Sequence, residues 1–454
     1  MNEPRPEPRR PHKIRWILGA VVLAAVLVTA YEGLGPSALA FAGGQPVALA
    51  EFKGEDPTGV PGALRSAGLI ERGQYLTRAA DCVACHTAEG GTPYTGGRAF
   101  VLPFGTLYST NITPDPATGI GGYSDAQFID AMRRGIGPNH ERLYPAMPYA
   151  SYAYLSDGDV LAIKAYLFSL APANAPAPAN TLSFPFNQRS LMAIWAALFD
   201  SDRRFEPHPE RSGEWNRGAY LAEALAHCGE CHTPRNLFFA LDNRNKYAGA
   251  VQAGWRAFNI TPDREAGIGT WSAEDLAHYL SSGHADGRGT AAGPMGEAVD
   301  NSLRYLTAED IAALTAYVRS VTPGKSEDLP MPRESPAPRA PIDAQTAGLD
   351  PRGQAVYEGA CAGCHGWTGE SPVLAPASLV GTRAVNDPSA LNVAQIVIHG
   401  GPRHTSNDPG NMPAFGSSYS DEEIASVANY VTGRFGAKGS TLTAASIAKI
   451  RTQE

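Results

Sequence analysis

The chain has 454 residues, of which 43% are hydrophobic and 18% charged, and its formal net charge at pH 7 is −8. This length accommodates about three domains of roughly 100 to 150 residues, each large enough to bury its own core. The negative charge balance provides no basic field for nucleic acid and therefore excludes nucleic-acid binding as a function.

An apolar segment lies close to the N-terminus. Residues 17–30 carry no charge, and the basic residues that precede residue 16 include Arg9, Arg10, Lys13 and Arg15. This order predicts that the basic end stays in the cytoplasm and that the rest of the chain is exported. We expect a signal or membrane anchor at residues 1–31, favouring a retained anchor, with cleavage near residues 38–40 as the alternative. A linker at residues 32–67 would follow, on the periplasmic side of the inner membrane.

The sequence Cys-x-x-Cys-His occurs three times and uses all six cysteines. The copies comprise Cys82, Cys85 and His86, then Cys228, Cys231 and His232, and finally Cys361, Cys364 and His365. This spacing lets two thiols add to the vinyl groups of one porphyrin while the histidine binds the iron. A zinc-ribbon site would not explain the histidine that follows each cysteine pair, and disulfides within such closely spaced pairs would stabilise domains of this size poorly. We therefore predict three covalently bound haem c groups.

The similarity between the repeats extends beyond these motifs. An Arg-Gly pair precedes each motif, at Arg72, Arg217 and Arg352, and each repeat closes on a predicted helix with a polar N-cap, Ser156, Thr307 or Ser420. The segment Asn-Ile-Thr-Pro-Asp starts at Asn111 and again at Asn259. These asparagines are compatible with turn formation or with a hydrogen bond to a haem propionate. The arginines could likewise bind propionates or pack at the helix starts.

Proline-rich segments separate the repeats, at residues 171–179 and 323–341. We predict a mainly α fold of three tandem cytochrome c domains joined by these linkers. The predicted domains are residues 68–172, 213–323 and 348–437, with linkers at 173–212 and 324–347 and a C-terminal tail at 438–454. The apolar stretch at residues 190–199 is expected to pack on a neighbouring domain, with a contact surface as the alternative.

Three of the seven methionines lie at matching positions, each beside a proline and shortly before a closing helix: Met147, Met295 and Met412. A thioether opposite the histidine raises the reduction potential and saturates the iron. The predicted axial pairs are therefore His86 with Met147, His232 with Met295, and His365 with Met412. Four histidines could instead replace a methionine or bind a propionate, although we expect them to lie at the surface or to support a residue that binds the haem: His140, His284, His399 and His404. Three others have no supporting pattern: His208, His227 and His278.

Several segments together resemble one known family. With the haem motifs, residues 108–115, 143–149 and 228–236 are similar to the triheme cytochrome c subunits of bacterial membrane-bound dehydrogenases, and the similarity extends over about residues 70–435. The resemblance implies a large partner subunit carrying pyrroloquinoline quinone (PQQ), FAD or molybdopterin, as in alcohol, aldehyde, gluconate, sorbitol or fructose dehydrogenases. It also implies electron transfer from that partner to ubiquinone or to a downstream cytochrome or oxidase.

The sequence contains no catalytic triad, phosphate loop or nucleotide fingerprint. We expect no catalytic residues in this chain, which would serve as the electron-transfer subunit of an oxidoreductase complex. Two alternatives stay open: a stand-alone, membrane-attached multihaem carrier without a dedicated dehydrogenase, and a haem enzyme with one five-coordinate iron.

Overall fold

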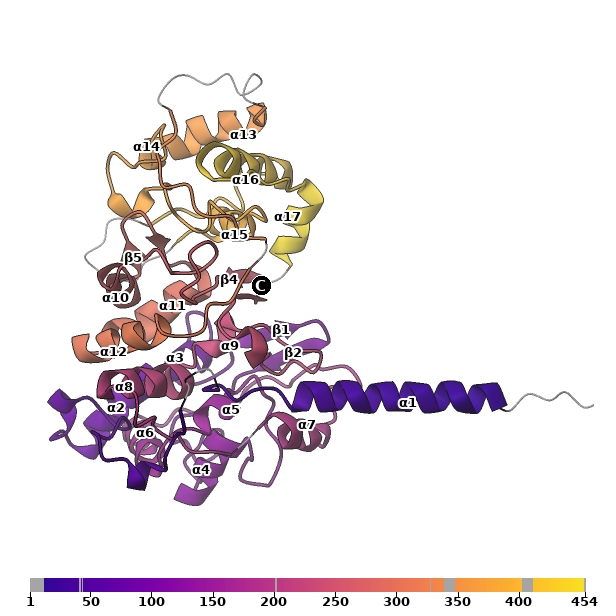
Figure 1. The fold of residues 1–454 in the computed structure, drawn as a ribbon, viewed down its shortest axis with the longest axis vertical. Helices are drawn as coiled ribbons and strands as arrows, with labels where there is room; N and C mark the ends of the chain where they lie inside the picture. Colours follow the sequence, from indigo (N-terminus) through magenta and orange to yellow (C-terminus); the bar gives the residue numbers. More distant parts are fainter. Residues whose placement is uncertain are drawn as a thin grey trace, which may run out of the picture.

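The computed structural model describes residues 12–40, 42, 44–200, 202–326, 328–338, 348–401 and 411–452. The described residues are mainly helical and contain three short antiparallel hairpins, which confirms the predicted mainly α class. Figure 1 shows the first two repeats together at one end of the body and the third repeat at the other. Parts of the second repeat lie between the first and the third.

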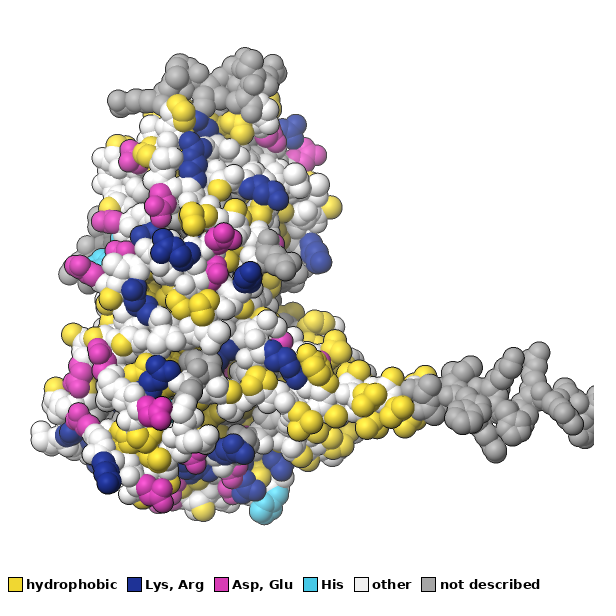
Figure 2. Space-filling view, in the orientation of Figure 1, with side chains coloured by type: hydrophobic (Ala, Val, Ile, Leu, Met, Phe, Trp, Pro, Cys, Tyr) yellow, Lys and Arg dark blue, Asp and Glu magenta, His cyan; other side chains and the backbone are white. Residues whose placement is uncertain are grey.

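Helix α1 (His12–Gly33) projects from the body (Figure 1). Its described side chains are largely apolar and exposed; Val21 and Leu27 are both 60% exposed. Figure 2 shows apolar side chains along this helix and around its base. Residues 1–11, including Arg9 and Arg10, lie outside the described residues. Within the described part of the chain, no helix combines the length and the apolar character needed to cross a membrane.

The first repeat begins after two single turns of 3-10 helix, η1 (Leu49–Glu51) and η2 (Gly62–Leu64). It comprises a leading helix α2 (Leu69–Ala79), motif helix α3 (Cys82–Cys85), hairpin β1 (Ala99–Leu102) and β2 (Gly105–Tyr108), α4 (Asp125–Arg134), α5 (Tyr149–Tyr152) and closing helix α6 (Asp157–Ser169). The predicted N-cap Ser156 starts α6, because its hydroxyl accepts a hydrogen bond from Asp159 N at 3.1 Å.

The second repeat follows the same order with additions. Helix α7 (Leu191–Phe199) lies in the connector before it. The repeat begins with leading helix α8 (Gly213–Tyr220), the π-helical turn η3 (Leu221–Leu225), motif helix α9 (Gly229–His232), η4 (Asn243–Asn245) and hairpin β3 (Ala250–Gln252) and β4 (Trp255–Ala257). It continues with α10 (Ala273–Ser282), hairpin β5 (His284–Ala285) and β6 (Gly289–Thr290), α11 (Gly293–Asn301), η5 (Leu303–Tyr305) and closing helix α12 (Ala308–Val318). Thr307 caps α12 through Asp310 N at 3.3 Å, as predicted.

The third repeat contains fewer elements. They are leading helix α13 (Pro351–Val356), the π-helical turn η6 (Tyr357–Cys361), motif helix α14 (Ala362–His365), η7 (Ala375–Ala377), α15 (Leu391–His399), closing helix α16 (Asp421–Phe435) and a last helix α17 (Ala444–Arg451). Ser420 caps α16 in a reciprocal capping box with Glu423. All three closing helices therefore begin at the predicted N-cap residues.

In each repeat a glycine lets the leading helix cross the closing helix in direct backbone contact. A Cβ atom at each of these glycines would clash with a carbonyl oxygen of the closing helix: Gly73 at 1.9 Å from Ala162 O, Gly218 at 1.9 Å from Ala313 O, and Gly353 at 2.1 Å from Ser426 O. Only glycine leaves room for such an approach. The repeated Arg-Gly pair therefore marks the point where the two helices cross.

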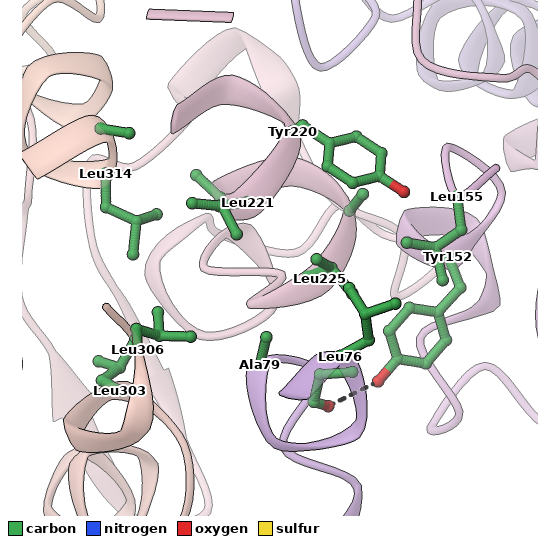
Figure 3. Close-up of a cluster of buried hydrophobic side chains, with 14 of the residues drawn as sticks. Leu76, Ala79, Tyr152, Leu155, Tyr220, Leu221, Leu225, Leu303, Leu306 and Leu314 are labelled. Atoms are coloured by element: carbon green, nitrogen blue, oxygen red, sulfur yellow. Dashed lines mark hydrogen bonds between the residues drawn. The ribbon is translucent and has the colours of Figure 1, made fainter. Parts of the chain in front are cut away.

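The first and second repeats share one hydrophobic core. Figure 3 shows Leu76 and Tyr152 of the first repeat gathered with Tyr220, Leu221 and Leu225 of the second, all within one contiguous cluster of buried residues. The third repeat has a separate core and a small cluster beneath α17. The expectation of one core per domain is therefore wrong for the first two repeats, because α2 packs on η3 and η5 of the second repeat.

Two reciprocal hydrogen bonds join the same two repeats. Tyr75 on α2 donates to Asp310 Oδ2 on α12 at 2.5 Å, and Tyr220 on α8 donates to Asp159 on α6. The tyrosines occupy equivalent positions in the leading helices, and the aspartates occupy equivalent positions in the closing helices. The two repeats thus pack with approximate twofold symmetry. The third repeat has Ala355 at the position of these tyrosines, so it cannot make the same bond.

The proline-rich connectors are extended and packed against the repeats. In the first connector, Thr181 N donates to Thr106 O at 2.9 Å, on β2. In the second, Arg333 N donates to Asn386 Oδ1 at 2.9 Å; residues 339–347 of this linker lie outside the described residues. Helix α7, in the predicted apolar stretch, packs through Trp195, whose Nε1 donates to a main-chain carbonyl of the second repeat at 2.8 Å.

Candidate haem-binding sites

The three Cys-x-x-Cys-His motifs lie on short helices directly after the leading helices. None of the six cysteines forms a disulfide. Burial raises the pKa of the Cys82 and Cys228 thiols to about 12, so both are protonated at neutral pH.

Each motif histidine forms a hydrogen bond from Nδ1 to a main-chain carbonyl. The bonds join His86 to Thr110 O at 2.6 Å, His232 to Phe258 O at 2.7 Å, and His365 to Ala377 O at 2.5 Å. Because a carbonyl oxygen can only accept, this contact assigns the proton to Nδ1 and leaves the lone pair of Nε2 free. Burial lowers the pKa of all three imidazoles, which keeps them neutral. A neutral imidazole with a free Nε2 fits the proximal ligand of a haem iron.

The repeated Asn-Ile-Thr-Pro-Asp segment fixes two of these acceptor carbonyls. Thr110, the acceptor for the first motif histidine, directly precedes Asn111. The side chain of Asn111 accepts from Thr113 N at 2.9 Å and donates to Ala173 O in the connector at 2.7 Å. Asn259 makes the equivalent bonds in the second repeat, at 2.8 and 2.6 Å. Of the two predicted roles for these asparagines, the structure shows turn formation.

The predicted methionine ligands lie in differing surroundings. Met147 and Met295 are partly buried against the shared core, and Met295 lies in the first turn of α11. Met412 is partly buried, and its carbonyl accepts from Gly401 N at 3.0 Å. Residues 402–410, which include His404, lie outside the described residues. The three axial pairs therefore stay predictions.

Two of the three arginines before the motifs, Arg217 and Arg352, have partners within the protein, whereas Arg72 Nε is buried without a hydrogen-bond partner. Arg217 Nε and Nη2 each lie 2.7 Å from a carboxylate oxygen of Asp310, and Nη1 donates to Pro57 O at 2.9 Å. Arg352 Nη1 lies 2.6 Å from Glu422 Oε2 at the exposed surface. Packing near the helix starts, the alternative to a propionate contact, therefore describes these two arginines.

Two of the remaining candidate histidines, His140 and His284, are described by the structure outside the haem motifs. His284 bonds to Thr290 Oγ1 and Asp286 Oδ1, both at 2.8 Å, within its own hairpin. His140 is exposed, in a left-handed backbone conformation with φ 62°. His140 agrees with the expected surface role, whereas the His284 side chain is only 12% exposed.

Sequence reasoning missed His227, which lies between the first two motifs. It directly precedes Cys228, and its ring lies 5.6 Å from that of Tyr152 in an edge-to-face contact. The Tyr152 hydroxyl in turn donates to Ala80 O at 2.9 Å, just before the first motif (Figure 3). Burial lowers the pKa of His227, so the imidazole is neutral. Its place beside a motif was the sole sequence signal, and the first repeat has Asp81 there.

Polar contacts also cross from the motif of one repeat to the methionine segment of the other. Ser151 Oγ, on α5 of the first repeat, donates to Glu230 Oε1 in the second motif at 3.1 Å. Arg98 Nη1 donates to Ala84 O in the first motif at 2.7 Å and to Glu297 Oε2 on α11 at 2.8 Å. The first and second motifs therefore lie at the interface between their repeats.

The third repeat contacts the second repeat at the hairpins β3–β4 and β5–β6. Arg256 Nη1 on β4 lies 3.0 Å from Asp387 Oδ1, whose side chain is fully buried. Thr290 Oγ1 on β6 donates to Pro376 O at 3.1 Å. Pro376 precedes Ala377, whose carbonyl accepts from the third motif histidine. The contact thus places the second repeat beside the loop whose carbonyl bonds to the third motif histidine.

Two family models match the chain. The model described as cytochrome c matches residues 70–171, and the model described as cytochrome c oxidase, cbb3-type, subunit III matches residues 349–431. These ranges overlap the first and third predicted cytochrome c domains.

Similar proteins have related descriptions. The chain is 40% identical over 403 residues to the fructose dehydrogenase cytochrome subunit of Gluconobacter japonicus, covering 84% of this chain and 82% of that protein. It is 36% identical over 409 residues to the gluconate 2-dehydrogenase cytochrome c subunit of Pantoea cypripedii, covering 85% and 90%. It is 42% identical over 376 residues to a nicotinate dehydrogenase subunit of Pseudomonas putida, where the match covers 82% of this chain and 31% of that protein. The chain thus spans about a third of the length of that last relative.

Proposed function

Because this chain belongs to the cytochrome c subunits of bacterial dehydrogenases, we propose that it transfers electrons from a partner dehydrogenase through three covalently bound haem c groups. The observation that carries the count of three is the recurrence of one geometry: in every motif a histidine donates from Nδ1 to a carbonyl and keeps Nε2 free. Each motif also supplies two cysteines, neither of them in a disulfide, for the porphyrin.

Bound haem c supplies one-electron redox chemistry. The residues of this chain orient the proximal imidazoles through Thr110, Phe258 and Ala377. They also hold the first two motifs together through the ring contact between Tyr152 and His227. This contact supports electron exchange between the first and second sites.

We further propose a large periplasmic partner subunit carrying PQQ, FAD or molybdopterin, and ubiquinone or a downstream cytochrome or oxidase as the acceptor. The names of the relatives, which include fructose, gluconate 2- and quinone-dependent alcohol dehydrogenases, support a dehydrogenase as the partner. Attachment at the periplasmic face of the inner membrane is supported by the exposed apolar side chains of α1, among them Val21 and Leu27.

Purification of the full chain from mildly solubilised native membranes tests the partner. We expect a large subunit to copurify with one of the three cofactors, and we expect the substrate of that subunit to reduce the haems. A chain that is isolated alone, with its haems and no second subunit, would contradict the proposed partner and would favour the stand-alone carrier.

The proposed sixth ligands make a separate prediction. Replacement of Met147, Met295 or Met412 by alanine should lower one reduction potential by on the order of 0.1 V or more, because axial ligands set haem potentials over about 0.8 V. The same replacement should let carbon monoxide bind one reduced iron. Redox titration and carbon monoxide difference spectra measure both effects.

Met331→Ala is the matched control, since Met331 lies in a connector and is 51% exposed. It should change neither the potentials nor carbon monoxide binding. A ligand variant that behaved like this control would remove that methionine from the assignment.

A further inference from the structure

A buried charged cluster lies directly before the second motif. Glu223, in the π-helical turn η3, is 5% exposed. Its Oε1 accepts from Tyr247 OH at 2.6 Å and from Tyr317 OH at 2.5 Å. Lys246 Nζ lies 2.5 Å from its other carboxylate oxygen, Oε2. These four residues form what we name the Glu223 cluster.

At the position that corresponds to Glu223, the first repeat has no carboxylate. Tyr94 and Tyr166 correspond to Tyr247 and Tyr317: Tyr94 and Tyr247 both follow a motif in a left-handed conformation, with φ 68° and 60°. In the first repeat the two rings contact each other edge to face at 6.2 Å. Five residues before the first motif cysteine, where the second repeat has its glutamate, the first repeat has the buried, neutral Thr77.

The difference between the two repeats begins in the backbone. One more residue separates Gly218 from Cys228 than separates Gly73 from Cys82. A π-helical turn accommodates such an extra residue within a helix, and Glu223 lies within that turn. The third repeat also has a π-helical turn, but its glutamate, Glu358, is exposed. Asp81, directly before Cys82 in the first repeat, is also a carboxyl group near a motif, but burial raises its pKa well above the ordinary value, which favours its neutral form. Among the described leading segments, the second is therefore the one in which a buried carboxylate is paired with a lysine.

Glu223 lies close to Cys228, one of the two cysteines that would attach the second haem. Cys228 N donates to the main-chain oxygen of Ala222, the residue directly before Glu223, at 3.0 Å, so the π-helical turn that holds the cluster is bonded to the first cysteine of the second motif. A negative charge stabilises the oxidised, more positive state of a nearby redox centre, and solvent screens this interaction poorly in a protein interior. The two tyrosine hydroxyls and the Lys246 ammonium keep the carboxylate in place without exposing it to water.

We propose that the Glu223 carboxylate holds the reduction potential of the second haem below the value that this site would have without the charge, and so sets it apart from the first haem. Glu223 acts through the haem, as a residue that tunes its potential, and does not contact an electron donor. This inference rests on the proposed attachment of a haem to Cys228 and Cys231.

Two substitutions with opposite expected signs test the proposal. Glu223→Gln removes the charge but keeps an oxygen that can accept from both tyrosines, so one of three potentials should rise while the other two stay unchanged. Lys246→Gln removes the compensating charge, so the same potential should fall. Spectroelectrochemical titration of the full chain measures both shifts. Glu309→Gln, at an exposed position on α12 of the same repeat, is the matched control and should shift none.

Haem content separates failure of this inference from failure of the proposed function. A Glu223→Gln protein that contains three haems but shows unchanged or lowered potentials would overturn the role of Glu223. If that variant does not fold, an unchanged or raised potential in Lys246→Gln would overturn it equally. If a protein with both Cys228 and Cys231 replaced by alanine contained as many haems as the unmodified protein, no haem would be attached at the second motif, and the proposed function itself would fail.

Discussion

Gly218→Ala should destabilise the protein by at least about 3 kcal/mol, at or beyond the upper end of the usual range for overpacking. A Cβ atom at Gly218 would lie 1.9 Å from Ala313 O and 2.7 Å from Tyr317 Cβ. The carbonyl belongs to the backbone of α12, so the clash cannot be relieved by a side-chain rotation. The two helices must separate instead, and both contribute to the core that the first two repeats share.

Gly213→Ala provides the control within the same helix. Gly213 is the first residue of α8, and a Cβ atom there would have no neighbour within 4 Å. Because alanine favours helix over glycine by up to about 1 kcal/mol, this variant should be as stable as the unmodified protein or slightly more stable. Urea unfolding of the two variants gives the comparison. Equal stability of the two would mean that the leading helix can move away from α12 at little cost.

Asp310→Ala should destabilise the protein by about 3–5 kcal/mol, the loss expected when one partner of a buried ion pair is removed. The Asp310 side chain is fully buried, and that of Arg217 is 11% exposed. The substitution leaves the guanidinium without its two carboxylate contacts at 2.7 Å, and it leaves Tyr75 without its acceptor. Because Tyr75 belongs to the first repeat and Asp310 to the second, the contact between the repeats should weaken as well.

The exposed pair of Arg352 and Glu422 is the comparison for this substitution. Their side chains are 56% and 66% exposed, and Glu422→Ala should therefore cost about 0–1 kcal/mol. The free energies of unfolding can be measured by urea titration under the same conditions. An Asp310→Ala protein that lost no more stability than Glu422→Ala would show that water replaces the carboxylate. The buried ion pair would then stabilise the fold no more than the exposed pair does.

Local features of the fold follow from the sequence alone. The N-caps Ser156, Thr307 and Ser420 were expected from a polar residue followed by acidic residues, and each accepts a hydrogen bond at the start of its closing helix. The three Cys-x-x-Cys-His motifs were likewise read directly from the sequence. These features depend on residues within a few positions of one another, which a sequence displays directly.

The pairing of the first two repeats could not be predicted in the same way. Tyr75 and Asp310 are 235 residues apart, and each on its own looks like an ordinary helix residue. His227 carries no pattern, because its contact with Tyr152 arises only when the two repeats come together. The Glu223 cluster depends on one additional residue in a leading helix, and a π-helical turn is needed to bring that side chain inward. Such contacts depend on tertiary packing, which a local pattern does not contain.

Intact mass spectrometry of the protein from its native host tests the central claim most directly. The account predicts a chain carrying three covalent haems and no thiol that reacts with an alkylating reagent after denaturation, because all six cysteines would be thioethers. Replacement of both cysteines of any one motif by alanine should remove one haem and leave two. A chain with fewer than three haems, or with free thiols in a motif, would contradict the three-haem electron-transfer function.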